Sequence, residues 1–533
     1  MYSRGLKQEN ATGVRGVDLP SIEIDDAKLA QMGKRPILKR NFGLWSILGF
    51  SCTILITWEG IVVLFLQAYE NGGSAGAVYG FIFVWIGVAS TFAVLSELAS
   101  MYQSLELDSL KSKANRSPGL PPQAGNIIGA QCWLTVIGWQ ATFATSCYLV
   151  GTLIQGLIAL THSNYQPQNW HGTLLFWAVV AFSLAINLVG GNLLPRLEVF
   201  ILVLHILGFF AILIPLVTTA DHGSGNEVFT EFQNLGGFPS QGLSFFVGMV
   251  GCIFAFAGGD AAVHMSEEIK NASTAVPASI MLSVLINGFL GFGMLIAMLF
   301  CLGDIEAALK SPTAYPFMSI FLQATGSVAG TAIMGSIITT MGISTSVGML
   351  ATTSRQFWSF ARDRGIPGWR VWSQVHGKNA MPVYSILLSA CVACLLALIN
   401  IGSSVAFNDL VAMSISGLYL SYMIVAGLLL YRRCTGKISS SDDGDIVTMN
   451  TAGAKLVWGP FHISGSWGVL VNTFALIYMS IAIFFSFWPP SWMVTVDSMN
   501  FSVVGTVGVI LLSLIYYVAR ARHIYDGPRV EIR

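Results

Sequence analysis

The sequence has few charged side chains. Charged residues make up 10% of its 533 residues, and 27 basic side chains balance 27 acidic ones, so the formal net charge is zero. A soluble domain carries about 25% charged residues. Hydrophobic residues reach 54%, and no polar stretch is long enough to form a separate soluble domain. This scarcity of charge excludes a soluble globular protein and indicates an all-α polytopic membrane protein.

Motifs that mark common enzymes and ATP-driven pumps are absent as well. The chain has no G-x-x-x-x-G-K-[S/T] phosphate loop, no H-E-x-x-H zinc site and no G-x-S-x-G in a strand–turn–helix setting. Its eight histidines are scattered, and its eight cysteines lie mostly in apolar runs without the spacing of a zinc site or a disulfide framework. We therefore expect no enzyme activity, no cofactor and no metal.

The N-terminus lacks the short apolar core and cleavage site of a signal peptide. Residues 1–42 are polar and basic, and we expect a disordered cytosolic tail there. The membrane domain is expected over 43–519 and a cytosolic C-terminal tail over 520–533. The basic, aromatic segment 352–368 is expected to form a helix at the membrane surface. Because it is tethered between apolar runs, it does not indicate a nucleic-acid partner.

Apolar runs long enough to cross a bilayer need about 20 residues each. Twelve such runs occur, and they predict twelve transmembrane helices, near residues 44–66, 77–100, 126–160, 173–190, 194–219, 242–265, 278–301, 327–353, 382–401, 404–431, 463–488 and 499–519. If the N-terminus is cytosolic and the spans alternate, 26 of the 27 basic residues fall in cytosolic segments and only Lys310 falls outside. This bias follows the positive-inside rule and places both termini in the cytosol.

Two of these spans contain a break near their middle. In the first span Gly49, Ser51, Cys52 and Thr53 precede Glu59. In the sixth span two adjacent glycines precede a cluster of ionisable residues, namely Asp260, His264, Glu267 and Glu268. Interrupted helices at matching positions indicate a transporter built from inverted repeats, here of five spans each with two further C-terminal helices. The alternative is that the sixth helix ends at the glycines and Asp260 caps a cytosolic helix.

The second break also carries a family resemblance. The run from Gly259 to Glu268, followed by Asn271 and Pro277, resembles the signature of fungal amino acid/choline/GABA permeases of the amino acid–polyamine–organocation (APC) superfamily. Further matching segments are Thr57–Gly60, Asn71–Gly73, Ser96–Met101, Gly138–Ala141, Leu194–Pro195 with Glu198 and His205, Thr353–Arg355 and Phe360–Asp363. The resemblance covers about residues 40–520. It implies a LeuT-like 5+5 inverted-repeat fold and transport of a small organic solute.

By this resemblance the two breaks face each other and bind the substrate. Helix N-termini at the breaks suit a substrate carboxylate. For the substrate amine, Glu59 is the first candidate and Asp260 the second. The expected substrate-binding residues are Gly49, Ser51, Cys52, Thr53, Glu59, Phe256, Ala257, Gly258, Gly259 and Asp260. For Ser51 and Thr53, bonding back to a helix carbonyl is an equal alternative. For Glu59 the alternative is a structural hydrogen bond between helices.

Ionisable residues elsewhere in the spans are candidates for proton coupling or gating. His205 in the fifth span and Glu198, seven residues earlier, form the leading pair for carrying a proton. Glu198 has the alternative of pairing with Arg196 near the cytosolic end. His264, Glu267 and Glu268 are expected near the inner mouth, in gating ion pairs with Arg355, Arg362 or Arg364.

The sequence therefore predicts a secondary active transporter for an amino acid or related amine (GABA, choline or a polyamine), coupled to protons. We expect it in the lipid bilayer of the plasma membrane, with the vacuolar membrane as the alternative. A nutrient sensor on a transporter scaffold is the competing function. One stretch departs from the family: residues 102–125 are polar and turn-rich where relatives continue with a Gly-Gly-x-Tyr segment. Such an atypical cytosolic loop also suits an inactive form from a mis-spliced transcript.

Overall fold

The computed structural model describes residues 25, 26, 29, 34–101, 124–189, 193–311, 313, 315–376, 380–402, 406–439, 456–495 and 498–525. The atypical loop expected at 102–125 lies outside these residues except for positions 124 and 125. The expected tails, 1–42 and 520–533, are described only in part.

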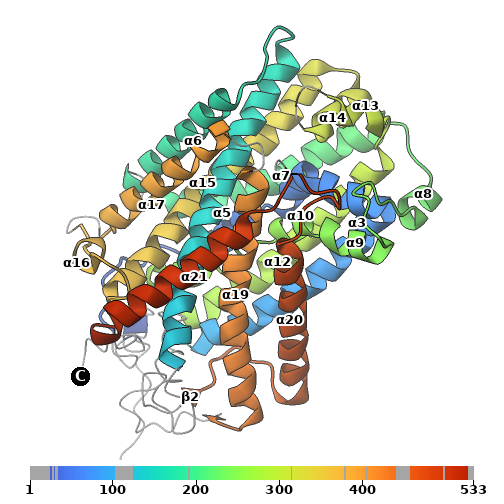
Figure 1. The fold of residues 1–533 in the computed structure, drawn as a ribbon. Helices are drawn as coiled ribbons and strands as arrows, with labels where there is room; N and C mark the ends of the chain where they lie inside the picture. Colours follow the sequence, from blue (N-terminus) through green and yellow to red (C-terminus); the bar gives the residue numbers. More distant parts are fainter. Residues whose placement is uncertain are drawn as a thin grey trace, which may run out of the picture.

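Helices dominate the described chain (Figure 1). The longer ones are α2 (Leu44–Leu55), α3 (Thr57–Met101), α5 (Ala124–Thr161), α6 (Asn169–Val189), α7 (Leu194–Thr219), α12 (Ala272–Phe300), α14 (Pro316–Thr325), α15 (Val328–Arg362), α17 (Val383–Leu396), α19 (Ala406–Cys434), α20 (Gly465–Ser486) and α21 (Ser502–Ala519). The short ones are α8 (Gly225–Thr230), α9 (Gln241–Gly248), α10 (Val250–Phe254), α11 (Ala261–His264), η1 (Ser266–Glu268), α13 (Ile305–Leu309), α16 (Trp369–Trp372), α18 (Ile399–Gly402) and η2 (Ala521–His523). Two short parallel strands, β1 (Ile438–Ser439) and β2 (Leu456–Val457), pair with each other.

Ten helical segments of the described chain are long and apolar enough to cross a membrane. The first of them covers 58 residues, from Leu44 to Met101, and includes both α2 and α3. Gly73 lies within α3 with a φ of 67° and a ψ of −170°, so two helices meet there at a kink. A Cβ at Gly73 would lie 2.6 Å from the Glu231 carbonyl oxygen, so this kink requires glycine. The chain is an all-α polytopic membrane protein.

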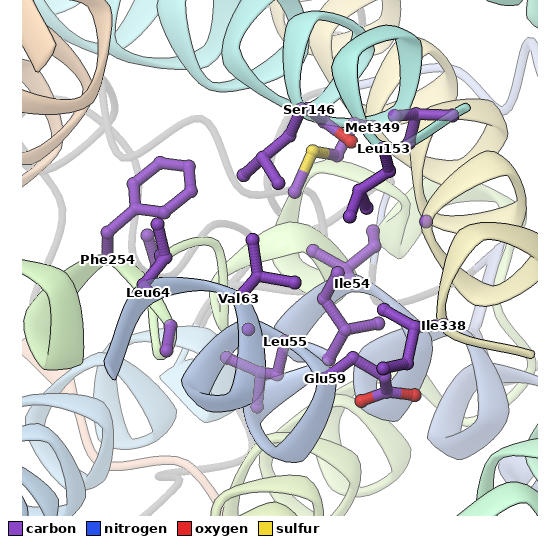
Figure 2. A pocket seen from close by; sticks show the side chains of 17 residues that line it. Ile54, Leu55, Glu59, Val63, Leu64, Ser146, Leu153, Phe254, Ile338 and Met349 are labelled. Carbon is purple, nitrogen blue, oxygen red and sulfur yellow. The ribbon is translucent and has the colours of Figure 1, made fainter. Parts of the chain in front are cut away.

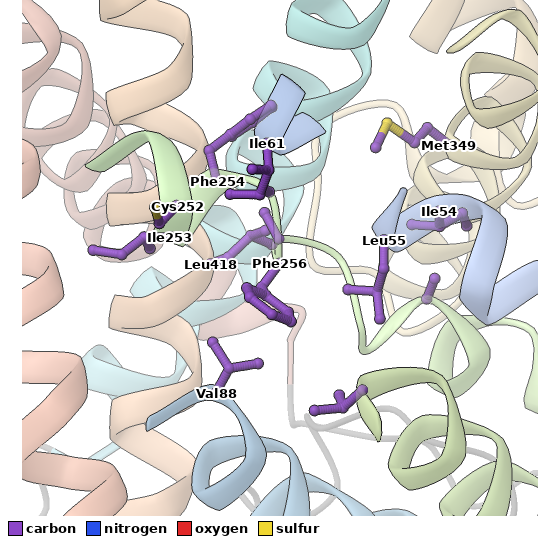
Figure 3. Packing of buried hydrophobic residues seen from close by; sticks show 14 of the residues in the cluster. Ile54, Leu55, Ile61, Val88, Cys252, Ile253, Phe254, Phe256, Met349 and Leu418 are labelled. Carbon is purple, nitrogen blue, oxygen red and sulfur yellow. The ribbon is translucent and has the colours of Figure 1, made fainter. Parts of the chain in front are cut away.

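The buried core lies between α3, α5, α12, α15 and α19; α12 packs closely on α3, and α5 packs closely on both α15 and α19. Its largest fully buried side chains include Trp58, Trp139 and Trp358. Figure 3 shows the part of this core around α10. Phe254 and Phe256 belong there to the same hydrophobic cluster as Val88 and Leu418, which lie far away in sequence. The segments that form the site described below are therefore held in a packed interior.

The outer helices expose their apolar side chains. In the apolar windows of α7 and α21, only 28% and 17% of the residues are buried. A helix that is apolar on its outer face suits contact with lipid chains. These two helices therefore belong to the membrane-facing surface.

Residues 34–42 lie against the protein, so the expectation of a disordered tail does not hold for them. Phe42 is fully buried and forms a parallel bridge with Ile269. Lys34 Nζ lies 2.8 Å from Asp363 Oδ1, and both side chains are almost completely buried. The tail is polar by composition, but Lys34 pairs with Asp363, and the Phe42 backbone bonds to Glu268 and Lys270 of the folded domain.

Two glycines allow α5 and α19 to cross closely. A Cβ on Gly417 would lie 2.8 Å from the Gly138 Cα, and one on Gly138 would lie 2.8 Å from the backbone nitrogen of Leu418. Small residues at helix crossings let backbones approach within a membrane, where packing drives association. The close approach of α5 to α19 depends on both glycines.

We therefore expect Gly417→Val to destabilise the protein, because the added side chain meets backbone atoms that cannot move aside. Overpacking of this kind costs about 1–3 kcal/mol, and thermal unfolding of the purified protein should occur several degrees lower. Gly427→Val is the matched control on the same helix, since a Cβ there meets no atom within 4 Å. Equal melting temperatures for the two variants would contradict this account of the crossing.

Candidate functional site

The first interrupted helix breaks at Ile56. Helix α2 ends at Leu55, Ile56 adopts left-handed backbone angles (φ 33°, ψ 47°), and α3 begins at Thr57. The expected position, Gly49 to Thr53, is therefore wrong by several residues, because that stretch is helical. Gly49 serves a different purpose: a Cβ there would overlap the backbone carbonyl of Glu198 on α7.

Asn287 of α12 satisfies the backbone on both sides of this break. Its side-chain oxygen accepts a hydrogen bond from the Thr57 amide at 3.2 Å, and its nitrogen donates to the Cys52 carbonyl at 3.4 Å. Unpaired backbone groups inside a membrane cost several kcal/mol. Asn287 thus holds the residues on either side of the strained Ile56.

The second helix is interrupted at the adjacent glycines, as the sequence predicts. Helix α10 ends at Phe254 and α11 begins at Ala261, with Gly258 between them at a φ of 91°. A Cβ on Gly258 would lie 3.0 Å from a methyl group of Ile54, and one on Gly259 would overlap the ring of Phe92. The glycines thus bring this segment close to α2 and α3.

A cavity lies between the two breaks (Figure 2). The space open to the centres of water molecules is about 40 Å³, enough for only a few of them. Its walls come from α2, α3, α5 and α15 and from the segment around the second break. The lining residues include Ile54, Ile56, Ala257 and Ser146, and Glu59 is the only ionisable side chain among the described residues that line it. The cavity is therefore apolar with one carboxylate.

Glu59 pairs with His205 inside the protein. The His205 Nδ1 lies 2.8 Å from Glu59 Oε1, and both side chains are at most 1% exposed. The second Glu59 oxygen and His205 Nε2 have no hydrogen-bond partner among the described residues. Glu59 lies in the first turn of α3, where the positive end of the helix dipole favours a negative charge. The break at Ile56 thus creates a helix N-terminus that helps to stabilise a buried carboxylate.

Asp260 forms a second buried cluster at the other break. Its Oδ2 accepts a hydrogen bond from Trp139 Nε1 at 3.3 Å and lies 3.0 Å from His264 Nε2. The Trp139 and His264 rings pack edge to face, with centroids 5.8 Å apart. The Asp260 side chain makes no cap hydrogen bond to α11. Asp260 therefore occupies the N-cap position of α11, but its side chain links α11 to α5 and does not cap the helix.

Glu198 is buried against α2. Its Oε2 lies 2.9 Å from Thr53 Oγ1, and the same hydroxyl is also within hydrogen-bond distance of the Gly49 carbonyl, so its one hydrogen is shared between them or donated to one of them. The hydroxyl of Ser51 is buried and has no partner among the described residues. Thus the two residues expected to carry a proton contact the first interrupted helix separately, His205 through Glu59 and Glu198 through Thr53.

Ion pairs join the end of the second interrupted helix to α15. Arg355 Nε lies 2.9 Å from Glu268 Oε1, and an Arg362 nitrogen lies 2.7 Å from Glu267 Oε1. Two of the expected ion pairs are therefore present. His264 contacts Asp260, and Arg364 stacks on Trp369 with its Cζ 4.4 Å from the ring centroid.

Three polar residues of the site were not identified from the sequence. These are Asn287, Trp139 and Thr345, whose hydroxyl donates to the Thr53 carbonyl at 2.6 Å. Asn287 had a visible signal, because it is a lone amide in an otherwise apolar span. The described residues contain no group of three or more His, Cys, Asp or Glu side chains placed to hold a metal.

Comparisons with known proteins agree with this architecture. A model of the amino acid permease family matches residues 42–509. A choline transporter of Saccharomyces cerevisiae is 30% identical over 483 residues, which cover 90% of this chain and 81% of that protein. Amino-acid permease BAT1 of Arabidopsis thaliana is 25% identical over 530 residues, covering 96% of this chain and 97% of that protein. Amino-acid permease 2 of Neurospora crassa is 23% identical over 545 residues, which cover 99% of this chain and 93% of that protein.

The family match includes both interrupted helices, the cavity between them and most of the remaining spans. The chain therefore belongs to the amino acid permease family of the APC superfamily, which consists of membrane transporters and not of enzymes.

Proposed function

We propose that this protein is a secondary transporter for an amino acid or a related amine, working by alternating access around its two interrupted helices. The observation that carries the proposal is the buried cavity between the breaks at Ile56 and Gly258, with a single carboxylate in its wall. Discontinuous helices of this kind form the substrate sites of many secondary transporters. The relatives named as amino-acid permeases and as a choline transporter support the same substrate classes.

We also propose twelve membrane crossings with both termini in the cytosol. The Leu44–Met101 segment is about 87 Å long at 1.5 Å per residue, nearly three times the thickness of the hydrocarbon core, and it kinks at Gly73. It therefore crosses twice. The apolar helix Gln241–Phe254, continued through the break into α11, adds one crossing to the ten candidates.

For substrate binding we propose that Glu59 attracts the amine and that backbone amides of the second break bind a carboxylate, where the substrate has one. Among the residues expected from the sequence, Glu59 and Ala257 line the cavity, while Ser51 and Thr53 lie in the adjoining helix. The cavity has room for only a few water molecules, so we propose that the surrounding side chains move apart when substrate enters.

We propose that Glu59 and His205 carry the coupling proton. A carboxylate and an imidazole in contact can share one proton, and His is the side chain that ordinarily changes charge between pH 5 and 8. Two further ionisable side chains lie on the facing surfaces, namely Cys52 and Glu198. The pair sits at the hinge of the first interrupted helix, so its protonation can influence opening.

We propose that the ion pairs of Glu267 and Glu268 close the cytosolic side of the cavity. They join the segment after the second break to α15, and Lys34 of the N-terminal segment pairs with Asp363 at the end of the same helix. Opening toward the cytosol then requires these contacts to separate.

The first prediction tests transport and the cavity together. Purified protein in liposomes should take up at least one of four labelled solutes: a neutral amino acid, 4-aminobutyrate, choline or a polyamine. Ala257→Leu should reduce that uptake more than tenfold, because the larger side chain fills the cavity. Ala307→Leu, on an exposed face of α13, is the control. Specific binding without any uptake in the wild-type protein would favour the sensor function instead.

The second prediction concerns the proton. With an imposed pH gradient, the wild-type protein should accumulate its substrate up to about tenfold per pH unit for one coupled proton. The direction of the effective gradient distinguishes symport from antiport. His205→Gln should abolish accumulation but preserve substrate exchange without a gradient, because glutamine keeps a hydrogen-bond donor beside Glu59. His162→Gln, an exposed residue, is the control. Unchanged accumulation in His205→Gln would contradict this role.

The third prediction concerns the gate. Glu268→Arg and Arg355→Glu each place like charges in contact, and each should lower turnover at least tenfold while substrate binding, measured by thermal shift, persists. The double variant restores an ion pair and should recover part of the turnover, as a double-mutant cycle would reveal. Loss of binding together with turnover in the single variants would indicate a structural role instead of gating.

A further inference from the structure

A second hollow, separate from the cavity between the breaks, lies where α15 and α21 end. Its walls are the segment from Arg364 to Val371 on one side and Tyr516, Arg520, His523 and Ile524 on the other. Its volume is about 680 Å³, far larger than the central cavity. Both helices are candidate membrane spans, so this groove lies at the level where they leave the bilayer. In Figure 1 the end of α21 lies beside α16 at the same edge of the bundle.

The groove is basic. Arg364, Arg370 and Arg520 line it together with His523, and no Asp or Glu is among the described residues that line it. Arg370, Arg520 and His523 are exposed. Three arginines that line one hollow provide a site for an anion, since arginine binds phosphate through paired hydrogen bonds.

Trp369 lies between two of these arginines. The Arg364 Cζ lies 4.4 Å from the Trp369 ring centroid, and the Arg370 Cζ lies 5.5 Å from it. Arg364 also adopts a positive φ of 67° just after α15, at a position that glycine would occupy more easily. The sequence therefore places an arginine at an unfavourable backbone position, where its side chain packs on the indole at the groove.

A packed cluster that includes the lining residue Ile366 lies beside the groove and supports its walls. Tyr525 is 7% exposed, and its ring packs edge to face on Phe360 with centroids 6.1 Å apart. Its hydroxyl oxygen lies 3.8 Å from the Cys132 sulfur. Ile366 belongs to the same cluster and is 1% exposed. These contacts attach the segment after α21 to α5 and α15.

An apolar surface leads from the bilayer to this groove. Along α21 the exposed side chains Leu511, Leu512, Ile515 and Val518 run toward Arg520. Val371 on the opposite wall is 43% exposed. A ligand with an anionic head and hydrocarbon chains matches both parts of this surface, with its head among the arginines and its chains along α21.

We propose that this groove binds the headgroup of an anionic phospholipid of the leaflet that faces it. On the proposed orientation this is the cytosolic leaflet, where anionic lipids are concentrated. Basic pockets between transmembrane helices on this side are suited to phosphorylated headgroups. The binding itself does not depend on which solute the protein transports.

The test uses the purified full-length protein in neutral detergent with phosphatidylinositol 4-phosphate as the probe. Bound lipid is measured by native mass spectrometry and by the shift in melting temperature, with phosphatidylcholine as the reference lipid. Arg370→Gln with Arg520→Gln should weaken binding of the anionic lipid roughly tenfold to thirtyfold. Arg370→Lys with Arg520→Lys should bind more tightly than the glutamine pair, because the charges remain, but less tightly than the wild-type protein, because lysine cannot form paired hydrogen bonds.

A matched control removes the same charge elsewhere. Arg196 and Lys437 are exposed basic residues outside the groove, and Arg196→Gln with Lys437→Gln should bind the lipid as the wild-type protein does. An equal loss in both glutamine pairs would show general surface attraction and overturn the proposal. Stabilisation by inorganic phosphate at the same concentration, as strong as that by the lipid, would also overturn it, because the hydrocarbon chains would then contribute nothing.

Discussion

Hydrogen bonding of the backbone at the two helix breaks is the constraint on which the site depends. A bilayer supplies no water to an interrupted helix, so each free amide or carbonyl needs a partner from the protein or from a cavity. At Ile56 the amide side chain of Asn287 serves both sides of the break. This arrangement couples the first interrupted helix to α12, and it explains why a strained, β-branched residue can stand at the break without a glycine.

The same break makes a buried carboxylate tolerable. An isolated charge in a membrane interior is costly, but Glu59 lies in the first turn of α3 and in contact with His205. The helix dipole and the imidazole both favour the negative charge. At the second break Asp260 obtains comparable support from Trp139 and His264. Each carboxylate is thus held by a partner on a different helix.

Sequence reasoning located the parts of the site that depend on local chemistry. The membrane class follows from composition, the second break from two adjacent glycines, and the ion pairs of Glu267 and Glu268 from charges near a span end. The break at Ile56 was missed because no local residue marks it. Asn287, which bonds to both sides of it, lies 231 positions along the chain. The contact of His205 with Glu59 was not foreseen either, because it joins α7 to α3 and depends on how these helices pack.

The positions of hinge, carboxylate and cavity give the proposed mechanism a physical basis. Glu59 follows the break at Ile56 by three residues, so it moves with the first turn of α3, whereas His205 belongs to α7. If a substrate amine approaches Glu59, it competes with His205 for the same carboxylate. A change in that contact alters the force between α3 and α7 beside the hinge. Because the cavity has room for only a few water molecules, the proposed binding of substrate there would require such a movement. On this mechanism recognition of the amine, release or uptake of the proton and opening of the cavity are three effects of one contact.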